Sequence, residues 1–139
     1  DQPPEPVEEL MSGSGTILLI DDEEIVIESV GGMIEHLGYE LLVARSGKEA
    51  VRIYDTRGSD IDLVILDMIM PDMNGGETFE RLKAINPNVQ IILSTGYSAD
   101  GQANEILQRG CQGLINKPFT LAELSEKLKR ILQSPKSDG

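Results

Sequence analysis

The sequence has few of the residues that build covalent or metal cross-links. Its 139 residues include no tryptophan, one histidine and one cysteine, Cys111. A single cysteine excludes an internal disulfide and a cysteine metal cluster, and it favours a reducing environment, so we expect a cytoplasmic location. Apolar runs are also short. None approaches the roughly 20 residues of a membrane-spanning helix, and the N-terminus lacks a signal-peptide pattern, so we expect a soluble domain without membrane contact.

Positive charge is scarce as well. Lys and Arg number 12 against 24 Asp and Glu, which gives a formal net charge of −12 at pH 7. Such a surface repels phosphate backbones and anionic membranes. The composition therefore disfavours direct binding to nucleic acid.

The length fits one domain, at a prior of roughly 150 residues per domain. Prolines, acidic residues and a Ser/Gly run fill residues 1–14, a composition typical of a linker or tail. Residues 15–134 form the predicted domain, and residues 135–139 form a short C-terminal tail. The first residue is Asp1 rather than methionine, as expected of a piece of a longer protein.

Short apolar runs alternate with helical patterns along the predicted domain. Most of the runs are rich in Ile, Leu and Val without alternation, as in strands that are covered on both faces. The predicted strands are Thr16–Ile20, Glu40–Ala44, Leu63–Leu66, Val89–Ser94 and Gly113–Ile115. This order of five βα units predicts an α/β fold, a doubly wound parallel sheet with helices on both faces.

Helix signals lie between these runs. Ile27, Val30 and Ile34 are spaced for one helix face, and Gly38 is a predicted stop. Two further helices begin with a capping box, a Ser or Thr followed three residues later by Glu. The boxes are Ser46 with Glu49 and Thr120 with Glu123, and Asn74 with Glu77 is a looser version.

Polar side chains follow four of the strands, at the edge where ligands bind in such folds. Asp21 and Asp22 follow the first strand, Asp67 the third, Thr95 the fourth and Lys117 the fifth. At about 4 Å, two like charges repel by roughly 4 kcal/mol near a protein surface, so clustered carboxylates need a cation. Oxygen ligands without His or Cys suit Mg²⁺.

Each residue also has a simpler interpretation. Asp22 is an equally good candidate for a helix cap, and Thr95 alone is a turn or cap residue. Lys117 alone is a solvated surface lysine. The shared position at the ends of the strands favours a functional site over these separate explanations.

In their order and placement, these residues resemble the response-regulator receiver domain of two-component signalling. The resemblance covers nearly the whole predicted domain, and all four motifs occur in order at strand ends. The motifs are Ile20-Asp21-Asp22-Glu23, Leu66-Asp67 with Met70-Pro71-Asp72-Met73-Asn74-Gly75, Ser94-Thr95-Gly96-Tyr97, and Asn116-Lys117-Pro118-Phe119. The resemblance implies the flavodoxin-like strand order 2-1-3-4-5.

The resemblance also implies a role for each residue. Asp67 would be the phosphoacceptor, taking a phosphoryl group from a histidine of a histidine kinase or histidine phosphotransfer domain. Mg²⁺ would be held by Asp22, Asp67 and the backbone carbonyl of Ile69, and Asp21 would act mainly through a water molecule. Lys117 and Thr95 would contact phosphoryl oxygens. Such a domain catalyses its own aspartyl phosphorylation and dephosphorylation, but it is primarily a signalling domain.

One position departs from the receiver pattern, and two others are expected to affect the rate of dephosphorylation. The position of the switch aromatic on the fifth strand holds Leu114, so signalling is expected to depend on backbone shifts in the fourth strand and helix. Ile69 and Tyr97 are bulky, and our hypothesis is that they obstruct the attacking water and slow self-dephosphorylation, so that Ile69→Asn would speed phosphate loss.

Three other classes compete with the receiver. A docking module that works without phosphorylation is the main alternative, although the acids, Thr95 and Lys117 are intact. An aspartyl-phosphate hydrolase would need a second acid where Ile69 stands. A flavodoxin would need a Ser/Thr/Gly-rich loop after the first strand. The expected context is the terminal receiver of a hybrid sensor histidine kinase, with a free-standing regulator as the alternative, and the sequence leaves homodimer formation open.

Overall fold

The computed structural model describes residues 15–68, 73, 75–95, 106, 108, 110–117 and 119–132. Five parallel strands form one sheet in the order β2-β1-β3-β4-β5, which confirms the predicted fold class and strand order. The elements are β1 Thr16–Ile20, α2 Glu24–His36, β2 Glu40–Ala44, α3 Gly47–Arg57, a 3₁₀ turn η1 Gly58–Asp60, β3 Leu63–Asp67, α4 Gly75–Ile85, β4 Ile91–Thr95, β5 Gly113–Asn116 and α6 Leu121–Leu132.

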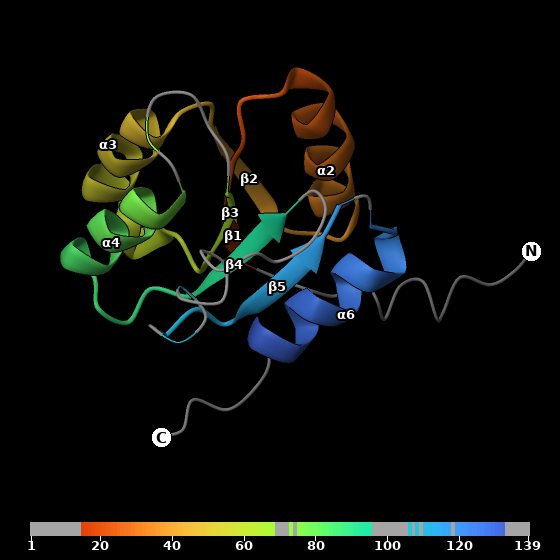
Figure 1. The fold of residues 1–139 in the computed structure, drawn as a ribbon. Helices are drawn as coiled ribbons and strands as arrows, with labels where there is room; N and C mark the ends of the chain where they lie inside the picture. Colours follow the sequence, from red (N-terminus) through yellow and green to blue (C-terminus); the bar gives the residue numbers. More distant parts are fainter. Residues whose placement is uncertain are drawn as a thin grey trace, which may run out of the picture.

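Helices cover both faces of the sheet (Figure 1), with α3 and α4 on one side and α2 and α6 on the other. Alternate strand residues point to opposite faces, so each strand contributes to both cores. Leu18 and Leu66 pack in the core under α3 and α4, whereas Leu19 and Ile65 pack in the core under α2 and α6. This explains the continuous apolar runs of the three central strands.

Local signals explain most of the element boundaries. Gly38 adopts a positive φ of 98° directly after Leu37, the C-cap residue of α2, which confirms the predicted helix stop. Thr120 and Glu123 form the full capping box, with a backbone N–H bonded to each side chain. At the start of α3, Ser46 accepts from the Glu49 backbone as predicted, but the Glu49 carboxylate accepts from the Arg45 N–H.

The predicted bounds of β4 were wrong at its start. The Val89 N–H donates to the Asn86 carbonyl and closes a turn, so the strand begins at Ile91 rather than Val89. The strands β3, β4 and β5 each extend one residue further than predicted, and they end at Asp67, Thr95 and Asn116. The helix predicted between the fourth and fifth strands falls largely outside the described residues. The candidate cap residue Asn74 falls wholly outside them.

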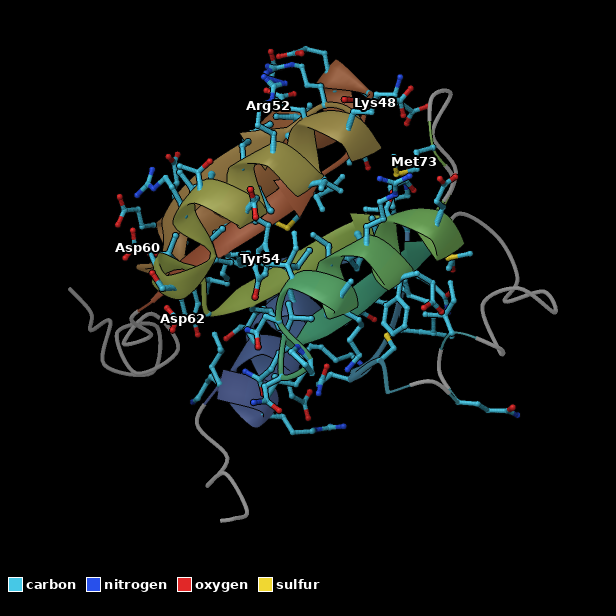
Figure 2. All side chains as sticks on the ribbon, turned by 90° about the vertical axis from the view of Figure 1, so that its left-hand side faces the viewer. Lys48, Arg52, Tyr54, Asp60, Asp62 and Met73 are labelled. Carbon is cyan, nitrogen blue, oxygen red and sulfur yellow. The ribbon has the colours of Figure 1, made fainter. Side chains whose placement is uncertain are left out.

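The layer formed by α3 and α4 is closely packed (Figure 2). Tyr54 extends from α3, and its hydroxyl accepts a hydrogen bond of 3.0 Å from the Asn86 side chain. At the other end of α3, a Cβ on Gly47 would lie 2.7 Å from the Cβ of Met73, so glycine permits this approach. None of the helices described has the length and apolar character that crossing a bilayer requires.

Candidate functional site

Three carboxylates meet at the carboxyl edge of the sheet. Asp21 and Asp22 follow β1, and Asp67 is the last residue of β3. Because β1 and β3 are adjacent parallel strands, with Ile20 opposite Leu66, their ends lie side by side. One oxygen from each carboxylate lies within 4.8 Å of the others. The structure therefore brings these predicted residues together, and we call them the acidic cluster.

Lys117, which directly follows β5, joins the acidic cluster. Its Nζ atom donates hydrogen bonds to Oδ2 of Asp21 at 3.4 Å and to Oδ1 of Asp67 at 3.2 Å. The side chains of Asp21 and Asp67 are only 2% and 9% exposed, so the ion pairs are well shielded from water. One ammonium group against three carboxylates leaves the site with an excess of negative charge.

The surroundings shift the proton affinities of the two paired groups. Burial and then the charge of Asp21 raise the pKa of Asp67 to about 6, and the opposing effect of Lys117 is smaller. Burial alone would lower the pKa of Lys117, but the charges of Asp67 and Asp21 outweigh it and raise that pKa. The site thus holds a carboxylate that is costly to ionise while the nearby negative charge is uncompensated.

The donor set of the acidic cluster fits a hard divalent cation. All of its ligand atoms are carboxylate oxygens, and Asp22 is exposed, so water can complete a coordination shell. Neither His nor Cys belongs to the cluster, which disfavours zinc. The carbonyl of Ile69 and the side chain of Tyr97 lie outside the described residues, as do residues 69–72 and 74 of the loop that follows Met68.

Thr95 ends β4 beside the acidic cluster, and its side chain is engaged elsewhere. Its hydroxyl group donates a hydrogen bond of 2.8 Å to Oδ1 of Asn116. Asn116 is opposite Thr95 in the parallel register of β4 and β5, and the Lys117 N–H donates to the Thr95 carbonyl at 2.7 Å. Asn116 is part of the sequence motif after the fifth strand, but we predicted no role for it. The register of the two strands was the signal that pointed to it.

The interpretation of Asp22 as a helix cap is wrong. The N-cap residue of α2 is Glu23, which makes no side-chain cap hydrogen bond. The neighbouring Asp21 instead accepts a hydrogen bond of 2.9 Å from the Glu23 backbone N–H. Asp21 is therefore fixed by the backbone, and Asp22 is left exposed at the rim.

Gly75, the first residue of α4, supports the backbone under Asp67. Its N–H donates to the Met68 carbonyl at 2.9 Å. A Cβ at this position would lie 2.9 Å from Cα of Met68 and 3.2 Å from the carbonyl oxygen of Asp67. Only glycine allows α4 to begin this close to the end of β3.

The fold is that of a known signalling family. The sequence model of the response regulator receiver domain matches residues 17–129, so the chain belongs to that family. It is 34% identical over 125 residues to the sensor kinase CckA of Brucella abortus, covering 88% of this chain and 13% of CckA. It is 30% identical over 115 residues to the autoinducer 1 sensor kinase/phosphatase LuxN of Vibrio campbellii, covering 83% of this chain and 13% of LuxN.

Solved structures agree with this assignment. A receiver domain protein from Clostridium thermocellum has a TM-score of 0.81 and 31% identity, covering 86% of this chain and 94% of that one. The receiver domain of a Pseudomonas aeruginosa sensor histidine kinase has a TM-score of 0.79 and 27% identity, covering 88% of this chain and all of the other. That structure has a magnesium ion coordinated in its active site cleft.

Proposed function

We propose that this chain is a phosphoacceptor receiver domain of a phosphorelay, in which Asp67 takes a phosphoryl group from a phosphohistidine of a partner protein. The observation that carries the proposal is the placement of Asp67. It ends β3 within 4.8 Å of two further carboxylates and is paired with Lys117. A solvated surface acid needs neither arrangement.

The chemistry is a transfer between two nucleophiles. An Oδ atom of Asp67 attacks phosphorus, a P–O bond forms, and the P–N bond to the donor histidine breaks with its electron pair going to the ring nitrogen. The Lys117 ammonium group lies 3.2 Å from Asp67, where it balances the negative charge on a phosphoryl oxygen. Thr95, at the end of the next strand, donates its hydroxyl hydrogen to a second phosphoryl oxygen.

Asp21, Asp22 and Asp67, with the Ile69 carbonyl, would hold Mg²⁺. When bound, the ion supplies positive charge that offsets the carboxylates and the incoming phosphoryl group. The support for it here is the cluster of oxygen ligands and its excess of negative charge. Asp21 is held by the Glu23 N–H and by Lys117, which favours a supporting role through water for this carboxylate.

The partner is a histidine kinase or a histidine phosphotransfer domain, and the output is a change in partner interactions in the cytoplasm. The hybrid sensor kinase is the context we favour, because the relatives CckA and LuxN are sensor kinases. The alternative is a docking module that works without phosphorylation. The pairing of Asp67 with Lys117 argues against this alternative. Ionising the buried Asp67 carboxyl group costs free energy, and a docking module without phosphorylation has no use for such a group.

The decisive experiment is intact mass spectrometry after incubation with acetyl phosphate, with and without Mg²⁺. We expect one phosphoryl adduct in wild type that requires Mg²⁺ and is absent from Asp67→Asn. Asp55→Asn, which changes an exposed aspartate of α3, is the matched control and should still be modified. If the folded wild type formed no adduct with acetyl phosphate or with a phosphorylated histidine kinase, the docking module would replace the receiver proposal.

A further inference from the structure

The hydroxyl group of Thr95 already has a partner in the structure, and that partner is outside the acidic cluster. We propose that Asn116 is a positioning residue that competes with the phosphoryl group for this hydroxyl and so lowers the affinity of the site for phosphoryl. The inference rests on the proposed function, in which Thr95 donates to a phosphoryl oxygen.

The geometry makes the two interactions exclusive. The Oγ1–Oδ1 distance of 2.8 Å is that of a well-formed hydrogen bond. A threonine hydroxyl carries one hydrogen, and both the amide oxygen and a phosphoryl oxygen accept hydrogen bonds. Thr95 must therefore release the Oδ1 atom of Asn116 before it can donate to a phosphoryl group. Because Thr95 is only 5% exposed, its hydroxyl is poorly placed to replace that bond with bulk water.

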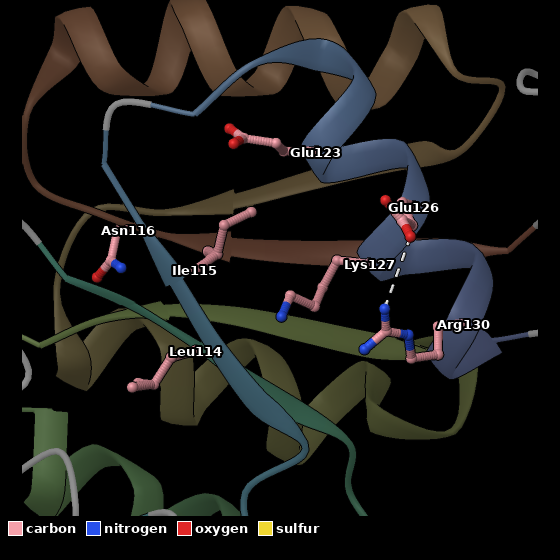
Figure 3. A pocket seen from close by; sticks show the side chains of 7 residues that line it. All are labelled: Leu114, Ile115, Asn116, Glu123, Glu126, Lys127 and Arg130. Atoms are coloured by element: carbon pink, nitrogen blue, oxygen red, sulfur yellow. Dashed lines mark ion pairs between the residues drawn. The ribbon is translucent and has the colours of Figure 1, made fainter.

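The position of Asn116 on β5 determines which group Thr95 meets. Figure 3 shows Leu114 and Asn116 on one side of the strand and Ile115 on the side of α6. Of the two residues on the first side, Leu114 has an apolar side chain and packs against the core under α3 and α4. Asn116 is thus the residue of that pair that can accept the Thr95 hydrogen.

Asn116 can also be removed without opening the core. It is exposed, and it borders a hollow of about 260 Å³ between β5 and α6. Its amide therefore keeps access to water when Thr95 leaves. The backbone bond from the Lys117 N–H to the Thr95 carbonyl holds the ends of the two strands together whichever partner the hydroxyl has.

The test measures binding of a phosphoryl mimic, beryllofluoride, by calorimetry of the full chain at saturating Mg²⁺. We expect Asn116→Ala to bind beryllofluoride more tightly than wild type, by about 2- to 12-fold, the factor that the net free energy of one hydrogen bond gives. Asn88→Ala, an exposed asparagine before β4, is the control and should bind as wild type does. Affinity for Mg²⁺ alone should be the same in all three proteins, which a general structural defect would not allow.

A second background isolates the contact. In Thr95→Ala, the further change Asn116→Ala should leave beryllofluoride affinity unaltered, because no hydroxyl remains to be held. Equal affinity of Asn116→Ala and wild type would overturn the inference and leave the proposed function standing. The same gain in the Thr95→Ala background would also overturn it. If wild type itself bound no beryllofluoride, the proposed function would fail and this inference with it.

Discussion

Lys117 lies between Asp21 and Asp67, with its Nζ atom 3.4 Å from one carboxylate and 3.2 Å from the other. The two acids come from neighbouring strands, and the lysine follows an edge strand on the far side of β4. A single ammonium group therefore compensates charge that the fold has brought together from distant parts of the sequence. Its removal tests how much of the stability depends on that compensation.

We expect Lys117→Met to lower the free energy of unfolding in EDTA by about 2–3 kcal/mol. The change leaves two shielded carboxylates without their cation, and uptake of a proton by Asp67 keeps the loss below the 3–5 kcal/mol of a fully buried pair. Urea denaturation measures the difference. Lys129→Met, which removes a lysine near the far end of α6, is the control. A loss no greater than that of the control would show that Lys117 does not compensate the acidic cluster.

The raised pKa of Asp67 predicts a pH dependence of stability in the metal-free protein. Its pKa rises from 3.8 to about 6 in the folded chain, so the folded state holds this proton more tightly than the unfolded state. The Asp67 contribution is most favourable below about pH 4, falls as the pH rises through 6, and is level above about pH 7. The difference between wild type and Asp67→Asn isolates it, at about 1–3 kcal/mol across that window.

Urea denaturation of both proteins at pH 5 and pH 7.5, in EDTA, measures this contribution. Relative to Asp67→Asn, wild type should lose stability on going to the higher pH, and Mg²⁺ should restore it there because the ion binds the folded state. An increase in relative stability with pH would mean that Lys117 outweighs burial and lowers the pKa of Asp67.

Gly75 is predicted to be essential to the backbone beneath Asp67. In Gly75→Ala the new Cβ meets Cα of Met68 at 2.9 Å, and backbone atoms cannot move aside as a side chain does. We expect a loss of about 1–3 kcal/mol in stability and slower phosphorylation by acetyl phosphate.

Gly32→Ala is the matched control for this change. Gly32 also lies in a helix, but a Cβ there would meet nothing within 4 Å. We expect this variant to gain about 0.5–1 kcal/mol, because alanine is the better helix former. Similar losses in both variants would contradict the proposed close contact at Gly75.

The capping box at the start of α6 should contribute measurably to stability. Thr120 accepts a hydrogen bond of 3.1 Å from the Glu123 N–H, and Thr120→Ala removes this acceptor. We expect a loss of about 1 kcal/mol, and a loss of only a few tenths for Thr120→Gly. Thermal or urea unfolding of the two variants decides the point: equal stability of Thr120→Ala and wild type would show that the cap contributes nothing.

Much of the architecture was predictable because its signals are local or repeated. Each central strand is a short apolar run, and a strand covered on both faces needs that composition. Parallel strands expose their carboxyl ends at one edge, so the meeting of Asp21, Asp22 and Asp67 followed from their positions after strands. The start of β4 was predicted wrongly because Val89 is apolar, and an apolar residue in a turn cannot be told by its type from the first residue of a strand.

The remaining features of the site depend on the register of neighbouring strands and on which of several possible partners each polar side chain contacts. The sequence places Asn116 at the end of the fifth strand, but it does not show which neighbouring side chain Asn116 contacts. Its contact with Thr95 appears only when β4 and β5 are aligned. The Asp21 side chain accepts hydrogen bonds from the backbone N–H at the start of α2 and from Lys117. The sequence alone does not reveal that one carboxylate both fixes the backbone and pairs with the lysine.

The strand β5 is only four residues long and lies at the edge of the sheet. Its last residue, Asn116, accepts a hydrogen bond from Thr95. The next residue, Lys117, supplies the ammonium group that pairs with the acidic cluster. An exposed edge strand invites pairing with other chains, and short strands that end in charge resist it. The short length of β5 and the charge of Lys117 directly after it thus also limit edge-to-edge aggregation, so we expect an insertion that lengthened this strand to lower solubility.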